Sequence, residues 1–142
     1  IKKFIDSGFK FRLAISLNSV DNKQRTKIMP INKKWPIETI IKEGNRYTQN
    51  NKSCVMYEYV LLKNVNDSDD DAVKLSKLLA NSDSKLNIIP YNETDLEYSR
   101  PSNDRIERFT KIVFNNRRNF RVLIRWSKGD DIDAACGQLA GK

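Results

Sequence analysis

Histidine is absent from the 142 residues, and cysteine occurs only twice. The absence of histidine removes the commonest acid–base group and metal ligand of proteins. The two cysteines, Cys54 and Cys136, lie in unlike surroundings, which does not suggest a disulfide framework and favours a reducing compartment. The sequence has no pair of CxxC motifs, no glycine-rich phosphate loop and no HExxH motif, so it predicts no metal site of its own.

Long apolar runs are also missing. No segment is apolar over the length of a bilayer and no signal-peptide pattern occurs, so we expect no membrane partner and a cytoplasmic location. The net charge of +8, from 26 basic and 18 acidic residues, favours a polyanionic partner such as nucleic acid. Basic residues next to Trp35 and Trp126 agree with stacking on RNA bases, although a solvated surface is the simpler interpretation.

Apolar segments with strand character alternate with amphipathic helical segments. We expect strands over residues 12–17, 55–62, 86–89 and 120–126. We expect helices over residues 22–29 and after Pro36, Ser68 and Ser102. Ser68 and Asp71 have the spacing of a capping box, and the helix after Ser68 is expected to bury Val73, Leu75, Leu78 and Leu79. Continuous apolar strands separated by amphipathic helices predict an α/β fold, a parallel sheet covered by helices.

Polar residues follow the predicted strands at the ends where such sheets bind ligands. Ser16 and Asn18 end the first strand and Asn92 follows the third, although taken alone these are ordinary turn-forming residues. Glu58 lies in the middle of an apolar strand, where an unpaired charge is costly. It either lines a polar pocket or pairs with an arginine such as Arg12, and ion pairing is the commoner outcome.

Cys136 lies in a segment of small and polar residues at 128–142, after the last regular element. A thiol in that setting is accessible, which is typical of a reactive cysteine, although an inert loop cysteine is the alternative. Without histidine, activation would require a basic side chain or the positive charge of a cofactor. Cys54 opens a strand and is better explained as a packed residue.

Five sequence blocks occur in a particular order. They are LAISLN at 13–18, MPINKK at 29–34, EYVLL with VNDS at 58–68, NIIPYN at 87–92 and GDDIDAACGQLAG at 129–141. In this order they resemble the RlmN family of radical S-adenosylmethionine (SAM) enzymes, which methylate C2 of an adenine in 23S rRNA and in certain tRNAs. The resemblance covers essentially all 142 residues.

The resemblance implies the later half of a partial (βα)6 barrel, similar to a TIM barrel. Residues 1–127 would form its βα units and residues 128–142 its catalytic cysteine loop. The family's RNA-recognition domain, its second catalytic cysteine and the CxxxCxxC motif for a 4Fe–4S cluster belong to an earlier half, which these residues do not contain. We therefore expect the chain to be inactive alone and the complete enzyme to need SAM, the cluster and an electron donor.

The resemblance also assigns roles to individual residues. Cys136 matches the cysteine that is methylated by a first SAM and then carries the methylene to adenine C2, after a radical from a second SAM has removed a hydrogen. Ser16, Leu17, Asn18 and Asn92 match positions that contact SAM. The metal ligands lie outside this chain.

Two alternative functions stay open. One is the related C8-specific rRNA adenine methyltransferase that confers antibiotic resistance. The other is a non-catalytic RNA-binding relative. Asn18 is the reason to consider it, because the family usually has histidine at this position. The edge of the strand at 12–17 would have no partner in a half-barrel, so we also expect either self-association through this edge or poor order of this region.

Overall fold

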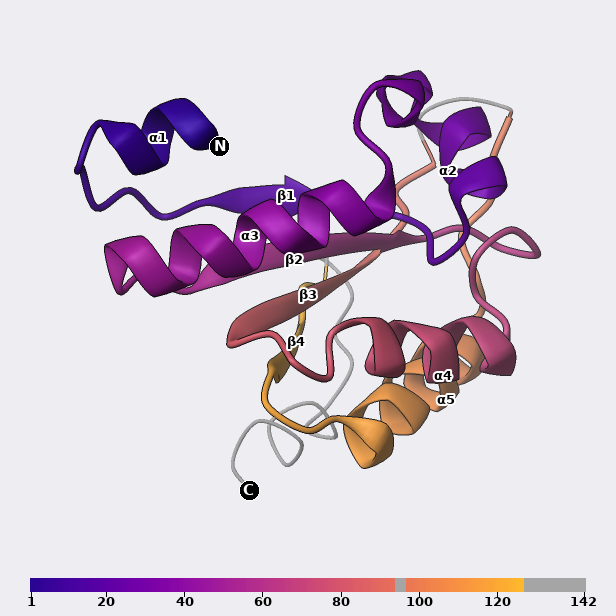
Figure 1. Cartoon of the computed structure of the whole chain (residues 1–142). Coiled ribbons are helices and arrows are strands. Elements are labelled where there is room, and N and C mark those ends of the chain that lie inside the picture. Colours follow the sequence, from indigo (N-terminus) through magenta and orange to yellow (C-terminus); the bar gives the residue numbers. More distant parts are fainter. Residues whose placement is uncertain (94–96, 127–142) are drawn as a thin grey trace.

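The computed structural model describes residues 1–93 and 97–126, which form one parallel sheet with the strand order β1-β2-β3-β4 (Figure 1). Consecutive strands are neighbours in the sheet, so a crossover segment connects each pair. The strands are β1 (Ala14–Ser16), β2 (Val55–Leu61), β3 (Ser84–Pro90) and β4 (Arg121–Ile124). The helices are α1 (Lys2–Asp6), α2 (Asn22–Ile28), the 3-10 helix η1 (Pro30–Lys33), α3 (Ile37–Asn51), α4 (Asp69–Leu78) and α5 (Asn103–Asn116). The predicted α/β class is confirmed.

One face of the sheet is covered by helices. Tyr57 of β2 lies so close to Gly44 of α3 that a Cβ atom at this glycine would overlap the tyrosine hydroxyl. Tyr59, two residues further along β2, stacks on Phe109 of α5 with 5.6 Å between ring centroids. Because residues two apart share a face, α3 and α5 cover the same side of the sheet. Met56, Glu58 and Val60 alternate with these tyrosines and are partly exposed on the other side, here called the open face.

The boundaries of all four strands differ from the expected ones, those of β2 by a single residue at its end. β1 is shorter than predicted; its last residue, Ser16, is exposed, and Leu17, which follows it, is buried. β3 begins earlier and includes Pro90, which pairs in register with Leu61 as the last residue of both strands. Proline is tolerated there because the end of a strand does not require its missing N–H. β4 is shorter than predicted at both ends.

The buried stripe of α4 also differs from the prediction. Val73 and Leu78 are only partly buried, and Ala72 and Ser76 lie in the core instead. Small side chains are suitable here because α4 packs directly against α5. The hydroxyl of Ser76 donates to the carbonyl of Ala72 at 2.9 Å, so this polar group is satisfied inside the core.

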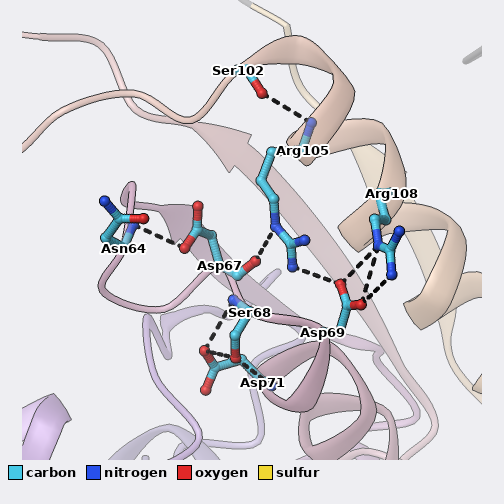
Figure 2. Close-up of polar contacts among 8 residues, drawn as sticks. All are labelled: Asn64, Asp67, Ser68, Asp69, Asp71, Ser102, Arg105 and Arg108. Atoms are coloured by element: carbon cyan, nitrogen blue, oxygen red, sulfur yellow. Dashed lines mark hydrogen bonds and ion pairs between the residues drawn. The ribbon is translucent and has the colours of Figure 1, made fainter.

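The N-terminal ends of α4 and α5 are tied together by arginines (Figure 2). Arg105 donates through Nε to the carbonyl oxygen of Asp67 at 2.6 Å and through Nη2 to Asp69 at 2.7 Å. Arg108 donates to the same Asp69 carboxylate at 2.5 Å. The predicted capping box between Ser68 and Asp71 is confirmed. Within residues 1–93 and 97–126, no helix combines the length and apolarity needed to span a membrane.

The shared carboxylate predicts acid sensitivity. Hydrogen bonds from Arg108 and then Arg105 lower the pKa of Asp69 to about 2. Because the pKa in the folded state lies below the ordinary value, this carboxylate stabilises the fold above about pH 4 and loses that effect as the pH falls toward 2. We expect Asp69→Asn to lower the urea midpoint at pH 7 and to narrow the difference between the midpoints at pH 7 and pH 2.

Asp70→Asn is the matched control, because Asp70 lies in the same first turn but pairs with the exposed Lys74 of its own helix. Both variants remove the same charge near the helix N-terminus. Equal effects of the two variants would contradict a specific role for the Asp69 contacts.

Candidate functional site

The predicted site residues that the structure describes lie along one edge of the sheet. Ser16, Leu17 and Asn18 are at the carboxyl end of β1, and Asn92 follows β3 by two residues. In a parallel sheet all carboxyl ends meet at the same edge, which is where such folds bind ligands. Asn18 also reaches the next strand, because its Oδ1 accepts a hydrogen bond from the backbone N–H of Val60 at 2.9 Å. Cys136 lies outside the described residues.

Leu17 anchors the end of β1 in the core. Its side chain is 0% exposed, its N–H donates to the carbonyl of Glu58 at 2.8 Å, and its carbonyl accepts from Arg25 at 2.7 Å. A ligand therefore finds no side-chain surface at Leu17. This residue fixes the positions of Ser16 and Asn18 on either side of it.

A polar row crosses the open face beside this strand end. Ser16, Glu58 and Asn87 are in register on β1, β2 and β3, so they point to the same side. In the described ranges none of these three side chains forms a hydrogen bond or an ion pair, and the expected pairing of Glu58 with Arg12 is not formed. A hydroxyl, a carboxylate and an amide thus point to this face, where Ser16 is exposed, Glu58 is partly exposed and Asn87 is only 7% exposed. We call Ser16, Glu58 and Asn87 the polar row.

Arg25 holds the strand end from the other side, and the sequence analysis missed it. This side chain of α2 is 1% exposed, and its guanidinium donates to the carbonyl of Ser16 at 2.8 Å as well as to that of Leu17. A third hydrogen bond goes to Oδ1 of Asn32 in η1 at 2.8 Å. Burial lowers the pKa of Arg25 from its ordinary value, but these fixed oxygens replace the water that the guanidinium loses. Arg25 therefore joins β1, α2 and η1.

A buried asparagine completes the edge. Asn66, 0% exposed, donates through Nδ2 to the carbonyls of Asn18 at 2.9 Å and Val60 at 2.7 Å. Its Oδ1 accepts the N–H of Leu62 at 2.8 Å, and its own carbonyl accepts the hydroxyl of Tyr59. The side-chain amide of Asn66 therefore binds backbone groups at the ends of both β1 and β2, and these hydrogen bonds fix the two strand ends relative to each other.

The described cysteine has the properties of a packed thiol. Cys54 is partly buried, and burial followed by the charge of Asp83 raises the pKa of its thiol. A raised pKa lowers the thiolate fraction and hence reactivity. Residues 1–93 and 97–126 also contain no group of three or more histidine, cysteine, aspartate or glutamate side chains placed to hold a metal ion.

A cationic side chain lies close to the ring of each of the two tryptophans named in the sequence analysis. The Lys34 ammonium lies 5.6 Å from the ring centroid of Trp35, which is 49% exposed. The Arg100 guanidinium lies 6.0 Å from that of Trp126. An exposed aromatic ring beside a cation suits stacking on bases near phosphate groups, so the nucleic-acid interpretation stays consistent with the geometry.

Known proteins are similar to this chain in both sequence and fold. The chain is 46% identical over 129 residues to the dual-specificity RNA methyltransferase RlmN of Desulfosudis oleivorans, and the alignment covers 90% of this chain. It is 43% identical over 145 residues to the probable dual-specificity RNA methyltransferase RlmN of Endomicrobium trichonymphae, with 98% covered. The crystal structure of a radical SAM methyltransferase from Sphaerobacter thermophilus superposes with a TM-score of 0.82 at 36% identity over 97% of this chain. No family model matches the chain.

The chain belongs to the RlmN family. It spans 34% and 41% of the two RlmN relatives and 41% of the crystallised methyltransferase. The resemblance inferred from the five sequence blocks is therefore confirmed by sequence identity over most of the chain and by the fold. Within this RlmN-family fold, the carboxyl edge carries the polar row, Asn18 and the supports supplied by Arg25 and Asn66.

The role of Arg25 in this RlmN-family chain can be tested by removing its donors. Arg25→Met keeps much of the apolar stem but leaves the carbonyls of Ser16 and Leu17 without donors, so we expect a loss of about 3 kcal/mol in the free energy of unfolding. Arg46→Met, at an exposed arginine of α3, should change it by less than about 0.5 kcal/mol. Urea unfolding followed by circular dichroism measures both, and similar losses in the two variants would contradict the assignment.

Proposed function

We propose that this chain is the C-terminal part of a radical SAM RNA methyltransferase that methylates adenine C2 in 23S rRNA and tRNA. Residues 1–127 would supply βα units of its barrel, and residues 128–142 its catalytic cysteine loop. The observation that carries the proposal is the polar row on the open face, beside the strand end that Arg25 and Asn66 hold in place. Membership of the RlmN family supports the reaction class.

The polar row fits SAM by its chemistry. SAM carries an ammonium group, a carboxylate and two ribose hydroxyls, which need both acceptors and donors. The carboxylate of Glu58 is an acceptor for the ammonium group or the hydroxyls, while Ser16 and Asn87 offer donors. Asn18 and Asn92 lie at the same edge and are the further proposed contacts, and Leu17 contributes by anchoring the strand. When bound, SAM supplies the methyl group and, with a 4Fe–4S cluster, the radical chemistry.

The cluster requires ligands from elsewhere. Three cysteines are the family's cluster ligands, and this sequence has two cysteines in all, neither of them in a CxxxCxxC motif. We propose that the cluster and its electron donor act in the complete enzyme, and that the chain alone is inactive. The open edge of β1, which pairs only with β2 among the described strands, is the proposed site of self-association.

Cys136 is the proposed methyl carrier. The other cysteine, Cys54, is held as a packed thiol with a raised pKa, so it does not compete for this role. The absence of histidine does not prevent methyl transfer, because a sulfonium is electrophilic enough to react with a thiolate directly. The net charge of +8 supports an RNA substrate, and rRNA and tRNA place the proposed activity in the cytoplasm.

Cysteine variants test the proposed chemistry in the complete protein. We expect Cys136→Ala to abolish RNA methylation and to remove the single methyl group that mass spectrometry detects on the peptide containing Cys136. Cys54→Ala is the matched control and should retain both signals. Methylation of RNA by the Cys136→Ala variant would overturn the proposed carrier.

The position of the methyl group separates the proposed function from its alternatives. Digestion of the methylated RNA and mass spectrometry against standards should give 2-methyladenosine. A product methylated at C8 would favour the related resistance enzyme. RNA binding without any methylation, by complete protein with a reconstituted cluster, would favour the non-catalytic relative.

Binding of SAM tests the polar row. We expect Glu58→Gln to weaken SAM binding about 10-fold, because it removes a charge-assisted hydrogen bond while keeping the size of the side chain. Glu107→Gln is the matched control, since Glu107 is exposed on α5 and far in the sequence from the row. Equilibrium dialysis with radiolabelled SAM and complete protein measures both affinities. Wild-type affinity of the Glu58→Gln variant would contradict a role for the row in binding SAM.

A further inference from the structure

A hollow lies at the carboxyl edge, and its lining includes none of the polar row. It has a volume of about 500 Å³ and lies between α2 and the loop that joins β2 to α4. Lys23 and Lys27 of α2 line one side, Asn64 and Val65 line the other, and Tyr98 also belongs to the lining. We call this hollow the α2 cleft. Neither the polar row nor the proposed SAM contacts take part in it.

The walls of the α2 cleft are fixed by hydrogen bonds. Gln24 of α2 donates through Nε2 to the carbonyl of Val65, and its Oε1 accepts the hydroxyl of Ser19 at 2.7 Å. Asn64 is held in the left-handed region with φ of 57°, and its N–H donates to Oδ1 of Asp67 at 2.9 Å. Because α2 and the loop are bound to each other, the cleft is preformed, which lowers the cost of ligand binding.

The charges of the cleft suit an anionic chain. Lys23 and Lys27 are both exposed and lie four residues apart, on the same face of α2. The acidic residue of the lining, Asp21, accepts the N–H of Gln24 at 2.8 Å as the N-cap of this helix. The lining thus contains two ammonium groups and one carboxylate, and the carboxylate already binds a backbone N–H, so the lining favours phosphate groups.

The cleft also offers an aromatic surface. Tyr98 is partly exposed, and its ring meets that of Tyr91 edge to face at a centroid distance of 6.4 Å. Proteins bind single-stranded nucleic acids with exposed aromatic rings, on which bases stack, and with cations that contact the phosphates. The ring of Tyr98 and the two lysines provide both kinds of contact in one hollow.

The cleft lies next to the proposed reaction site. Gln24 in its wall precedes Arg25, which holds the end of β1, and Val65 precedes Asn66, which binds the carbonyl of Asn18. We propose that the α2 cleft binds a single-stranded segment of the RNA substrate, with phosphates on Lys23 and Lys27 and a base on Tyr98. This inference rests on the proposed function and extends it by naming where the RNA next to the target adenine is held.

Salt dependence of RNA binding tests the lysines. The probe is a fluorescein-labelled single-stranded RNA of about 12 nucleotides, within the usual site sizes, and anisotropy is measured with complete protein at several salt concentrations. Loss of two phosphate contacts in Lys23→Ala/Lys27→Ala should reduce the slope of log affinity against log salt by about 1.4. The control Lys42→Ala/Arg46→Ala removes the same charge at the same helical spacing on α3 and should leave the slope unchanged.

Substitution of Tyr98 tests the stacked base. Tyr98→Phe keeps the ring and should bind the probe like wild type, whereas Tyr98→Ser should bind it about 5- to 100-fold more weakly. Circular dichroism of both variants shows whether the fold is retained. A Tyr98→Ser variant that is folded and binds with wild-type affinity would overturn the stacking, and equal slopes in the two double variants would overturn the phosphate contacts.

The results also separate this inference from the proposed function. If the protein methylates C2 but the salt slope is unchanged in Lys23→Ala/Lys27→Ala, the proposed methyltransferase function stands and the proposed role of the α2 cleft is wrong. Binding that depends on the cleft without methylation would keep the cleft and reject the proposed reaction. Absence of any RNA binding by the wild-type protein would reject the cleft.

Discussion

The guanidinium of Arg25 is the interaction on which the carboxyl edge depends. β1 has only three residues and pairs with β2 alone among the described strands, so the carbonyls at its end need donors from elsewhere. Arg25 supplies two of them, at Ser16 and Leu17, and uses its remaining donors on Asn32 and on the carbonyl of Trp35. A lysine has no planar set of donors that reaches two consecutive carbonyls and an amide together, so the geometry requires arginine. The direction of Ser16, the placement of α2 and the wall of the α2 cleft all follow from this side chain.

The two faces of the sheet have different chemistry for one physical reason. Parallel sheets usually bury both faces, so their strands are apolar throughout. β2 follows that rule on the helix face, where Tyr57 and Tyr59 are 0% exposed, but places Glu58 on the open face. Covering the carboxylate, the hydroxyl and the amide of this row with apolar side chains would cost free energy, because they would lose their hydrogen bonds to water. A polar ligand can replace those hydrogen bonds. The charge that looked out of place in the sequence is thus the best local indication of the proposed SAM site.

The sequence was sufficient where structure depends on near neighbours. The capping box of Ser68 and Asp71, for example, needs only three residues of spacing. It was insufficient where a partner comes from another element. The burial of Ala72 and Ser76 depends on the approach of α5, and the role of Arg25 depends on where β1 ends, which no periodicity of α2 reports. The site residues at the ends of β1 and β3 were suggested by resemblance, and whether they contact SAM stays a prediction.

Asn18 shows how a departure from the family pattern can leave the site intact. Its φ of 56° lies in the left-handed region, which asparagine and histidine both adopt more readily than most residues. Its Oδ1 accepts the N–H of Val60, and Nδ2 lies 3.3 Å from the sulfur of Met29, so much of this side chain is used within the protein. An imidazole nitrogen could accept the same N–H, so a histidine at this position, which the resemblance implies for the family, would keep both the turn and the hydrogen bond between β1 and β2. Ser16, Glu58 and Asn87 are then the main proposed contacts to the cofactor. The presence of asparagine at position 18 does not by itself favour a non-catalytic protein.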